Sequence, residues 1–387
     1  MAMNDIYKLH LESIAPGGDA LGRFEGKTIF VEGGAPDETV ICRIINDHNT
    51  WARAEILEIN DPSPVRIKSA CDFAGICGGC NLAHINYEAQ VSAKENILKD
   101  SIARIAGIQS PLIKVFSSPP FEYRNRMQFH CFRQNENKKD KTRKFGLKGK
   151  KSEEIIAVND CLVAVAQIRN ILRTGALSIP PGKDRFTVFS KDDCFLNEGE
   201  QSRGKITLLG KEIILDASVF FQSNCFMLEK MILELRKAAE YADKNLQMAD
   251  LYCGVGTFAF FLHDLFDNVI CAEENKTAVS IARENLKGVN AEFIALRDTE
   301  WQRAVFQKSN KINFAVIDPP RAGLNIKLAA ALAREMIPAL AYVSCDPASL
   351  ARDSKILING GYKLKELMLF DFYPQTSHIE SMAVFVK

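Results

Sequence analysis

Short runs of apolar residues, separated by turn residues, occupy the first 60 positions of the chain. The segments KTIFVEG, ETVICRIIND and TWARAEILEIN are rich in Val, Ile and Thr, and the stretches between strands contain PGGD, EGK and GGAPDE. Val, Ile and Thr favour extended backbone, whereas Gly, Pro, Asn and Asp favour turns. Several short strands with glycine-rich turns are typical of a small barrel. We therefore predict a β-barrel over residues 1–60.

The apolar spacing changes after NDPSPVR, which has the composition of a linker. Residues 87–106 carry apolar side chains at intervals of three, four and seven, which predicts an amphipathic helix. These side chains are Val91, Leu98, Ile102 and Ile105. From about residue 110 the pattern is mixed and mostly strand-like. We predict a central mixed α+β domain over residues 61–215.

Helical patterns alternate with short apolar strands from about residue 216 to the end of the chain. The strands are MADLYC, NVICAEE, FAVID, ALAYVSC and SMAVFV. This alternation is typical of an open, mostly parallel α/β sheet. The fold class that we predict is therefore α/β, with the main sheet in residues 216–387.

Composition adds limits on location and partners. The chain has 387 residues, a net charge of +1 and eleven cysteines. Its first residues lack a signal-peptide pattern, and no apolar run approaches the roughly 18 residues that span a membrane. These features predict a cytoplasmic protein without membrane contact, in which reduced cysteines serve metal binding or catalysis. Because the net charge is small, any basic surface must be local.

A glycine loop lies in ADLYCGVGTFAFFL, between a predicted strand and a predicted helix. Gly254 and Gly256 let a ligand approach the backbone closely. Glu273 ends the next strand, where a carboxylate can accept hydrogen bonds from ribose hydroxyls. The loop alone fits NAD as well as S-adenosylmethionine, and a purely structural turn is a third interpretation.

The segment FAVIDPPRAGL helps to separate the two cofactors. It places Asp318 and Arg321 at the carboxyl end of a later strand, where open α/β sheets border their ligand crevice. The two prolines between them fix the loop and the direction of Asp318. Asp-Pro-Pro after a strand is typical of methyltransferases that act on bases, and a dehydrogenase does not need it. This motif favours S-adenosylmethionine.

Three cysteines in CDFAGICGGC are spaced C-x5-C-x2-C. They are Cys71, Cys77 and Cys80, and the glycines among them let the backbone fold around a compact group. With a fourth thiolate, such a set suits a [4Fe–4S] cluster or zinc. Structural zinc sites more often have two C-x2-C pairs, and only one is present here. The spacing therefore favours a cluster over zinc and over a metal-free loop.

Cys345 lies in AYVSCDPASLARD, between an apolar strand and a predicted helix that starts near Pro347. A helix N-terminus stabilises a thiolate, so we predict a lowered thiol pKa and a nucleophilic role. The alternative is a buried core thiol, which is common for free cysteines.

Seven segments of the chain resemble the RNA 5-methyluridine (uracil-5) methyltransferase family, in the family's order. They are GKTIFVEG with WARAEIL, CDFAGICGGCNLAH, FFQSN, DLYCGVGTF, IDPPRAGL, YVSCDPASLARD and HIESMAVF. The resemblance implies that the barrel is a TRAM domain and that the C-terminal sheet is a Rossmann-like methyltransferase domain. It also implies a [4Fe–4S] site with Cys161 as the fourth ligand. Within the family, the chain resembles bacterial 23S rRNA enzymes that carry both a TRAM domain and a cluster.

The chemistry of uracil methylation and the resemblance agree on two catalytic residues. Uracil C5 is too weak a nucleophile until a thiolate adds to C6, and a base must then remove the C5 proton. Cys345 and Glu380 match these roles, although Glu380 could be a surface charge. The resemblance assigns four residues to S-adenosylmethionine, beside Gly254 of the glycine loop. They are Gln222, Tyr252, Glu273 and Asp318.

Two basic regions are candidates for RNA binding. Residues 133–151, RQNENKKDKTRKFGLKGKK, form the densest basic run, just after Arg124 and Arg126. Lysine and arginine there could neutralise phosphates, although a solvated loop is the alternative. The barrel offers a second surface with Arg23, Lys27 and Arg53. Phe220 could stack on a base or belong to the core, and Asp298 could approach the adenine of the cofactor.

Three functional hypotheses follow. The first is S-adenosylmethionine-dependent methylation of uracil C5 in 23S rRNA. The second is the same reaction on the T-loop uridine of tRNA, and the third is an inactive RNA-binding or assembly factor. A dehydrogenase is less consistent with the sequence, because no hydride-transfer residues accompany the glycine loop. The sequence indicates no protein partner.

Overall fold

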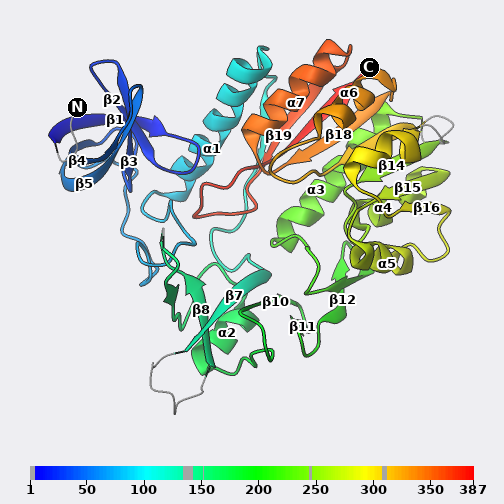
Figure 1. Cartoon of the computed structure of the whole chain (residues 1–387), viewed down its shortest axis with the longest axis horizontal. Helices are drawn as coiled ribbons and strands as arrows, with labels where there is room; N and C mark the ends of the chain where they lie inside the picture. The colour runs from blue at the N-terminus through cyan, green and yellow to red at the C-terminus, as the bar shows by residue number, and fades with distance from the viewer. Residues whose placement is uncertain (1–4, 134–142, 151, 244–245, 307–311) are drawn as a thin grey trace. The chain divides into compact units, whose positions relative to one another are not determined.

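The structure is a computed structural model, and it divides the chain into two compact units. The residues described are 5–133, 143–150, 152–243, 246–306 and 312–387 (Figure 1). The first unit comprises Met1–Ile97, Leu147–Val158 and Tyr373–His378. The second comprises Leu98–Gly146, Asn159–Phe372 and Ile379–Lys387. Each unit is described by itself, and the three predicted domains, 1–60, 61–215 and 216–387, stay a prediction.

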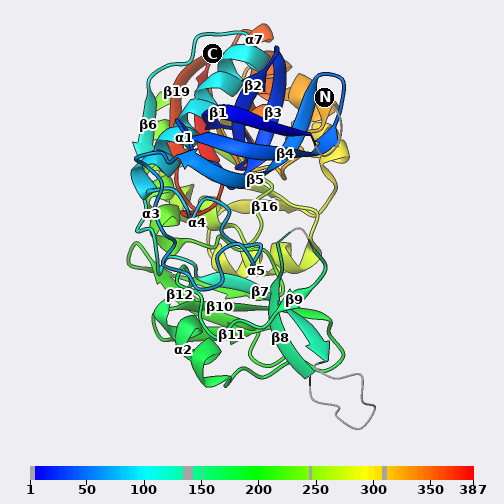
Figure 2. The same ribbon diagram turned by 90° about the vertical axis from the view of Figure 1, so that its left-hand side faces the viewer.

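The N-terminal part of the first unit is a closed barrel, shown in blue in Figures 1 and 2. Its five strands lie in the order β1-β2-β3-β5-β4, and β4 pairs back onto β1. The strands are β1 (Ile6–Ile14), β2 (Ala20–Phe24), β3 (Lys27–Glu32), β4 (Thr39–Asp47) and β5 (Trp51–Asp61). Side chains alternate along them, so Ile29 and Val31 fill the interior while Thr28 and Phe30 face outward. The predicted barrel is confirmed.

The predicted helix of residues 87–106 is also confirmed. Helix α1 (Tyr87–Ser101) continues into one turn of π-helix, η1 (Ile102–Ala106), which ends at the left-handed Gly107. Leu98 and Ile102 are buried, as their spacing predicts, whereas Val91 is half-buried and Ile105 is exposed.

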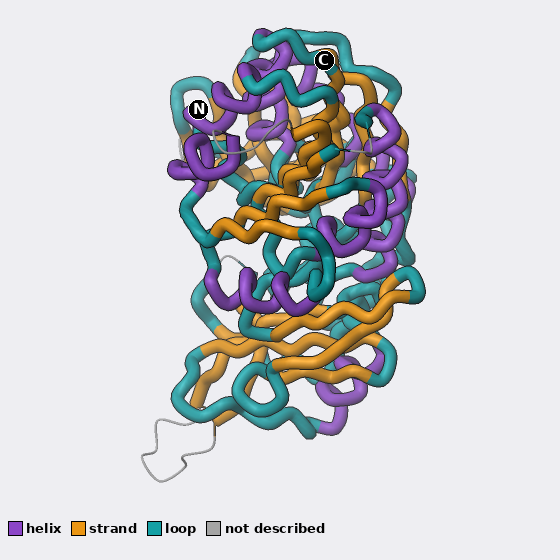
Figure 3. The backbone as a smooth tube through the Cα atoms, turned by 90° about the vertical axis from the view of Figure 1, so that its right-hand side faces the viewer, coloured by secondary structure: helices purple, strands orange, loops and turns teal. Residues whose placement is uncertain are grey.

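The second unit is built on an eight-stranded sheet of order β16-β15-β14-β17-β18-β20-β19-β6. Neighbours from β16 to β18 are parallel, β20 is antiparallel to both β18 and β19, and β6 is parallel to β19. The strands are β6 (Ile113–Phe116), β14 (Gln247–Leu251), β15 (Asn268–Ala272), β16 (Ala291–Ile294), β17 (Ile312–Ile317), β18 (Ala339–Ser344), β19 (Lys363–Phe370) and β20 (Glu380–Val386). Because β17 and β18 are buried at every position, helices must cover both faces of the sheet, and Figure 3 shows them there.

The helices of this unit lie in the connections between the strands. They are α2 (Ala166–Thr174), α3 (Cys225–Ala238), α4 (Thr257–Leu262), α5 (Lys276–Asn285), α6 (Ile326–Arg334) and α7 (Pro347–Asn359). Short helical turns occupy η2 (Ala239–Tyr241), η3 (His263–Leu265), η4 (Asp298–Glu300) and η5 (Gln302–Phe306). The predicted α/β class and all five predicted strands of the sheet are confirmed. Strands β6, β16 and β19 were not predicted, and β6 comes from the segment assigned to the central domain.

Smaller sheets complete the fold. Strands β11, β10, β7 and β8 are antiparallel neighbours, the end of β8 also pairs with β9, and β12 pairs with β13. Their bounds are β7 (Arg126–Arg133), β8 (Arg143–Lys148), β9 (Ile155–Ile156), β10 (Arg185–Lys191), β11 (Cys194–Asn197), β12 (Arg203–Leu208) and β13 (Lys211–Asp216). Among the residues described, no helix has the length and apolar character needed to cross a membrane.

Candidate active site

Three neighbouring strands of the main sheet end beside one another and bring the predicted catalytic residues together. Asp318 follows β17, Cys345 follows β18, and Glu380 begins β20. Strand β18 lies between the other two, and its Ser344 is paired with Ser381. Cys345 and Glu380 are the next residues in this antiparallel register. The sheet therefore places one thiol and two carboxyl groups at the same edge.

Cys345 lies in a tight connection between β18 and α7. The Ser344 hydroxyl donates to the Asp346 carbonyl at 2.9 Å, and the Asp346 carboxylate accepts a hydrogen bond from the Ser349 amide at 2.7 Å. Asp346 is thus the N-cap of α7 and Pro347 lies in its first turn, where proline needs no amide partner. The predicted position of Cys345 just before a helix is confirmed.

The helix was predicted to lower the pKa of the Cys345 thiol, and this prediction is wrong for the unliganded protein. Burial, with the carboxyl groups of Glu380 and Asp318 nearby, raises the pKa of Cys345 to about 12. The Arg321 guanidinium acts in the opposite direction but does not outweigh them. A helix terminus stabilises charge by a modest amount, and desolvation together with two acidic neighbours exceeds it.

The pKa values of the two carboxyl groups, Glu380 and Asp318, are also raised. Burial and the charge of Asp318 raise the pKa of Glu380 to about 8, with Arg321 opposing, and burial raises the pKa of Asp318 to about 7. The folded protein therefore binds these protons more tightly than the unfolded chain does. The contribution of these two groups to the free energy of unfolding is therefore most favourable at acidic pH. It falls as the pH rises from the usual pKa range of carboxyl groups through about 8.

We expect Cys345 to react slowly with iodoacetamide at neutral pH in the unliganded protein. The rate should rise about tenfold per pH unit from about pH 7 to pH 10, because the thiolate is the nucleophile. Mass spectrometry of the modified peptide distinguishes Cys345 from the other ten cysteines. Above about pH 8, where Glu380 is ionised, Glu380→Gln should raise the rate by removing a nearby negative charge, whereas Glu366→Gln on β19 should not. A rate that levels off near neutral pH would contradict this environment.

The glycine loop between β14 and α4 has the geometry of a ligand-binding turn. Tyr252, Gly254 and Gly256 all have positive φ, and a side chain on Gly256 would press against Ala282 of α5 at 3.1 Å. The space beside Gly254 is open. The Gly254 amide donates to a carboxylate oxygen of Glu273 at 3.2 Å, so the predicted ribose-binding residue lies at this loop.

Asp250 is a site residue that the sequence reasoning missed. It lies in β14, fully buried, and one carboxyl oxygen accepts a hydrogen bond from the Ala259 amide of α4 at 2.8 Å. The other oxygen is buried without a hydrogen-bond partner in the structure. Burial, with Asp318 and Glu273 nearby, raises the pKa of Asp250 to about 8. The acidic residue at the start of the segment DLYCGVGTF was the available signal.

Two further predicted cofactor residues lie in this unit. The Tyr252 hydroxyl donates to the Asp298 carboxylate at 3.0 Å, so the glycine loop contacts the segment in which Asp298 was predicted near adenine. Gln222 is half-buried in the loop that precedes α3. Its role in cofactor binding stays a prediction.

The predicted metal site is not shown by the structure. Cys71, Cys77 and Cys80 belong to the first unit and Cys161 belongs to the second. Over the described parts of the chain, no group of three or more His, Cys, Asp or Glu side chains could hold a metal ion. Backbone hydrogen bonds hold the three-cysteine loop. The Cys77 amide, for example, donates to the Phe73 carbonyl at 2.9 Å.

Ion pairs reduce the positive charge of the barrel surface that was predicted to bind RNA. Arg53 pairs with Asp19 at 3.1 Å, Arg23 lies 3.5 Å from Glu12, and Lys27 pairs with Asp47. Most of the basic run 133–151 lies outside the described residues, which resume at 143. In the second unit, Phe220 is 60% exposed, and the Arg126 guanidinium lies over its ring at 5.7 Å. The core interpretation of Phe220 is therefore wrong, and base stacking stays a prediction.

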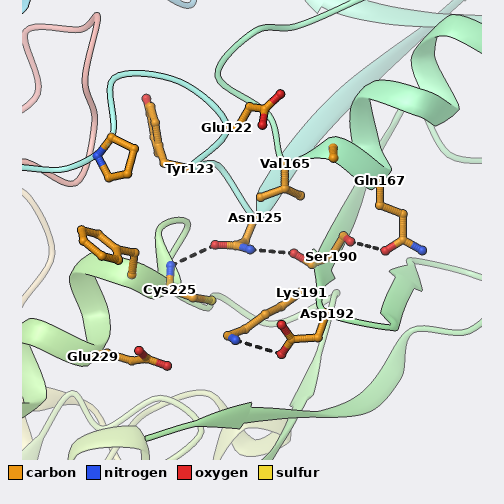
Figure 4. Close-up of a pocket in the computed structure, with 13 residues that line it drawn as sticks. Glu122, Tyr123, Asn125, Val165, Gln167, Ser190, Lys191, Asp192, Cys225 and Glu229 are labelled. Atoms are coloured by element: carbon orange, nitrogen blue, oxygen red, sulfur yellow. Dashed lines mark hydrogen bonds and ion pairs between the residues drawn. The ribbon is translucent and has the colours of Figure 1, made fainter.

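A separate pocket of about 430 Å³ lies in the second unit (Figure 4). Asn125 lines it, where it donates to the Ser190 carbonyl at 2.7 Å and accepts from the Cys225 amide at 2.9 Å. Lys191 and Asp192, which also line it, form an ion pair. None of the predicted site residues lines this pocket, so it is distinct from the candidate active site.

An open α/β sheet with a glycine loop and acidic residues at its strand ends is the arrangement expected of a methyltransferase that uses S-adenosylmethionine. A family model for tRNA (uracil-5-)-methyltransferases matches residues 203–387. An RNA methyltransferase of Treponema denticola, named as uncharacterized, is 32% identical, and the alignment covers 94% of each chain. The chain belongs to the RNA uracil-5 methyltransferase family, which the sequence resemblance predicted.

Two other similar proteins carry more specific names. The 23S rRNA (uracil(1939)-C(5))-methyltransferase RlmD of Pseudomonas putida is 29% identical over 98% of this chain and 93% of its own length. The crystal structure of Pyrococcus abyssi tRNA (uracil-54, C5)-methyltransferase with S-adenosyl-L-homocysteine matches with a TM-score of 0.72. That match covers 98% of this chain and 100% of the archaeal chain at 22% identity, and it supports the fold.

Proposed function

We propose that this enzyme methylates C5 of a uridine in 23S rRNA through a covalent bond between Cys345 and uracil C6. The observation that carries this proposal is the position of Cys345 between Asp318 and Glu380, at the ends of three adjacent strands. One nucleophile and one carboxylate base are what the chemistry requires. S-adenosylmethionine supplies the methyl group from its sulfonium sulfur.

Each bond that forms in the proposed reaction is matched by a bond that breaks. The Cys345 thiolate forms a bond to C6, and the displaced electrons make C5 nucleophilic. C5 then takes the methyl group, and S-adenosylhomocysteine leaves with the electrons of the broken carbon–sulfur bond. The Glu380 carboxylate removes the C5 proton, the C5–C6 double bond re-forms, and the Cys345 thiolate leaves C6. We call this last step adduct release.

The raised pKa values fit a site that is completed by a cation. Glu380 and Asp318 disfavour ionisation of Cys345, and Asp318 disfavours ionisation of Glu380, in the unliganded protein. A positive sulfonium bound at the same strand ends would favour the ionised forms of all three groups. In this proposal, Arg321 and the cofactor together prepare the thiolate and the carboxylate. Uracil must leave its base stack to reach Cys345, which favours a loop as the target.

The rRNA target rests on the relatives named as 23S rRNA enzymes. The tRNA alternative is supported by the fold shared with the Pyrococcus abyssi tRNA enzyme. An inactive assembly factor is less consistent with the site, because the nucleophile, the base and the glycine loop are all present and adjacent.

We expect labelled methyl groups to be transferred to a 23S rRNA fragment and not to a tRNA transcript. Both RNAs should be unmodified transcripts, and the product should be identified as 5-methyluridine after digestion. Truncation of the labelled fragment would then locate the uridine. Label in tRNA alone would overturn the rRNA target and leave the reaction intact. No label in either RNA would count against the proposed function.

We also propose that Cys71, Cys77, Cys80 and Cys161 hold a [4Fe–4S] cluster that no step above uses. The support is the C-x5-C-x2-C spacing and the resemblance, because four thiolates are the usual ligands of such clusters. Protein purified without air should contain about four iron atoms per chain and absorb near 400 nm. Cys80→Ser should lose the iron, whereas Cys194→Ser on β11 should keep it. One zinc per chain without iron would contradict the cluster.

A further inference from the structure

The loop Tyr373–His378 connects β19 to β20 and ends two residues before Glu380. It belongs to the first unit, although the strands on both sides of it belong to the second. Three side chains that bond to the loop, Asn81, Gln90 and Lys94, belong to the first unit as well. Whatever fixes this loop also fixes the point from which the chain enters β20.

Asn81 holds the end of the loop nearest to Glu380. Its amide nitrogen donates to the Ser377 hydroxyl at 3.0 Å, and its amide oxygen accepts from the Ser377 backbone at 2.9 Å. The same nitrogen also donates to the Gly17 carbonyl of the barrel at 2.7 Å. Asn81 directly follows Cys80, so one side chain links the cysteine loop, the barrel and the Glu380 loop.

Gln90 of α1 holds the middle of the loop in the same two-bond manner. Its amide oxygen accepts from the Gln375 backbone at 2.8 Å, and its nitrogen donates to the Gln375 side chain at 3.1 Å. The Leu82 amide adds a bond to the Gln375 carbonyl at 2.9 Å. Gln375 has a φ of 68°, a conformation that disfavours residues other than glycine. These bonds keep a strained residue in one conformation.

Lys94 holds the start of the loop. Its side chain is buried, and its ammonium group donates to the Tyr373 carbonyl at 3.0 Å. Within the loop, the Thr376 hydroxyl donates to the same carbonyl at 2.8 Å and accepts from the His378 amide at 3.2 Å. A buried ammonium is costly unless it is well bonded, so its presence marks a tightly specified position.

A connection between antiparallel strands needs only a short turn with exposed polar groups. This loop is instead bonded by three buried or half-buried side chains, and its own Gln375 and Thr376 are buried. We propose that Asn81, Gln90 and Lys94 are positioning residues, which set the entry of β20 and thereby the reach of the Glu380 carboxylate to the C5 proton. This inference rests on the proposed role of Glu380 as the base.

The test is a single-turnover reaction with Asn81→Ala, with enzyme in excess over RNA. Adduct formation and adduct release are followed separately as the appearance and decay of an SDS-stable protein–RNA complex. Formation should change less than about twofold, and release should slow about tenfold, because small misplacements of a catalytic group are costly. Asn81→Asp keeps the acceptor for the Ser377 amide and should lie between Asn81→Ala and wild type. Asn290→Ala removes an exposed bond to Asp267 and serves as the control.

Two reference variants separate this inference from the proposed function. Glu380→Gln should itself block release, and adding Asn81→Ala to it should slow release no further, since no base remains to be positioned. If Glu380→Gln releases RNA normally, the proposed function fails and the inference fails with it. If Glu380→Gln blocks release but Asn81→Ala behaves as wild type, or slows both steps equally, only the inference is overturned.

Discussion

Glu380→Gln is expected to stop the reaction after methyl transfer. The amide cannot accept the C5 proton, so the methylated uracil should remain bonded to Cys345 and the complex should survive SDS. A general base contributes about 10²- to 10⁴-fold, so the release rate should fall by that factor, which is roughly 3–5 kcal/mol of barrier. Adduct formation should not slow, because the substitution removes a negative charge beside the thiolate. Gel shift after SDS treatment and release of labelled RNA measure the two steps.

Glu366→Gln is the matched control for this prediction. Glu366 lies on neighbouring β19 and accepts a hydrogen bond from the Tyr241 hydroxyl at 2.7 Å. Glu366 is not among the charged groups that shift the pKa of the Cys345 thiol, so this variant should turn over like wild type. Fast turnover by Glu380→Gln would show that another group removes the C5 proton, and Asp318 would then be the next candidate.

Cys345→Ala is expected to abolish methyl transfer, by at least about 10⁴-fold. No other described thiol lies at these strand ends, and uracil C5 does not attack a methyl sulfonium without prior addition at C6. The affinity for S-adenosylmethionine, measured by calorimetry, should stay within about twofold of wild type. The reason is that the thiol would supply only a small part of the surface that contacts this ligand.

The control for this variant is Cys194→Ala, which removes a half-buried thiol from β11 and should leave both activity and affinity unchanged. A Cys345→Ala enzyme that methylates RNA at a measurable fraction of the wild-type rate would refute the covalent route. Loss of cofactor affinity in the same variant would instead assign Cys345 to ligand binding.

Features that depend on nearby residues could be predicted from the sequence. Mostly apolar runs such as FAVID and ALAYVSC predicted buried parallel strands, because a strand covered on both faces has no polar side. The glycine loop and the N-terminus of α7 were predicted because each depends on a few consecutive residues.

Features that depend on distant residues could not be predicted in this way. The four-residue edge strand β6 is too short to differ from a loop by composition. The raised pKa of Cys345 arises from Asp318 and Glu380, which are 27 residues before it and 35 after it, and only their register across the sheet makes them neighbours. Asn81 and Ser377 are 296 residues apart, so no local pattern indicates their contact.

The most direct test of the account is covalent capture with an RNA that carries 5-fluorouridine at the target position. Fluorine cannot leave C5 as a proton does, so release is blocked and the adduct should accumulate. Wild-type enzyme with S-adenosylmethionine should give an SDS-stable complex, and its RNA-linked peptide should contain Cys345. The Cys345→Ala enzyme should give none. A complex linked through another residue, or methylation of ordinary RNA without any captured complex, would contradict the central claim that Cys345 attacks uracil C6.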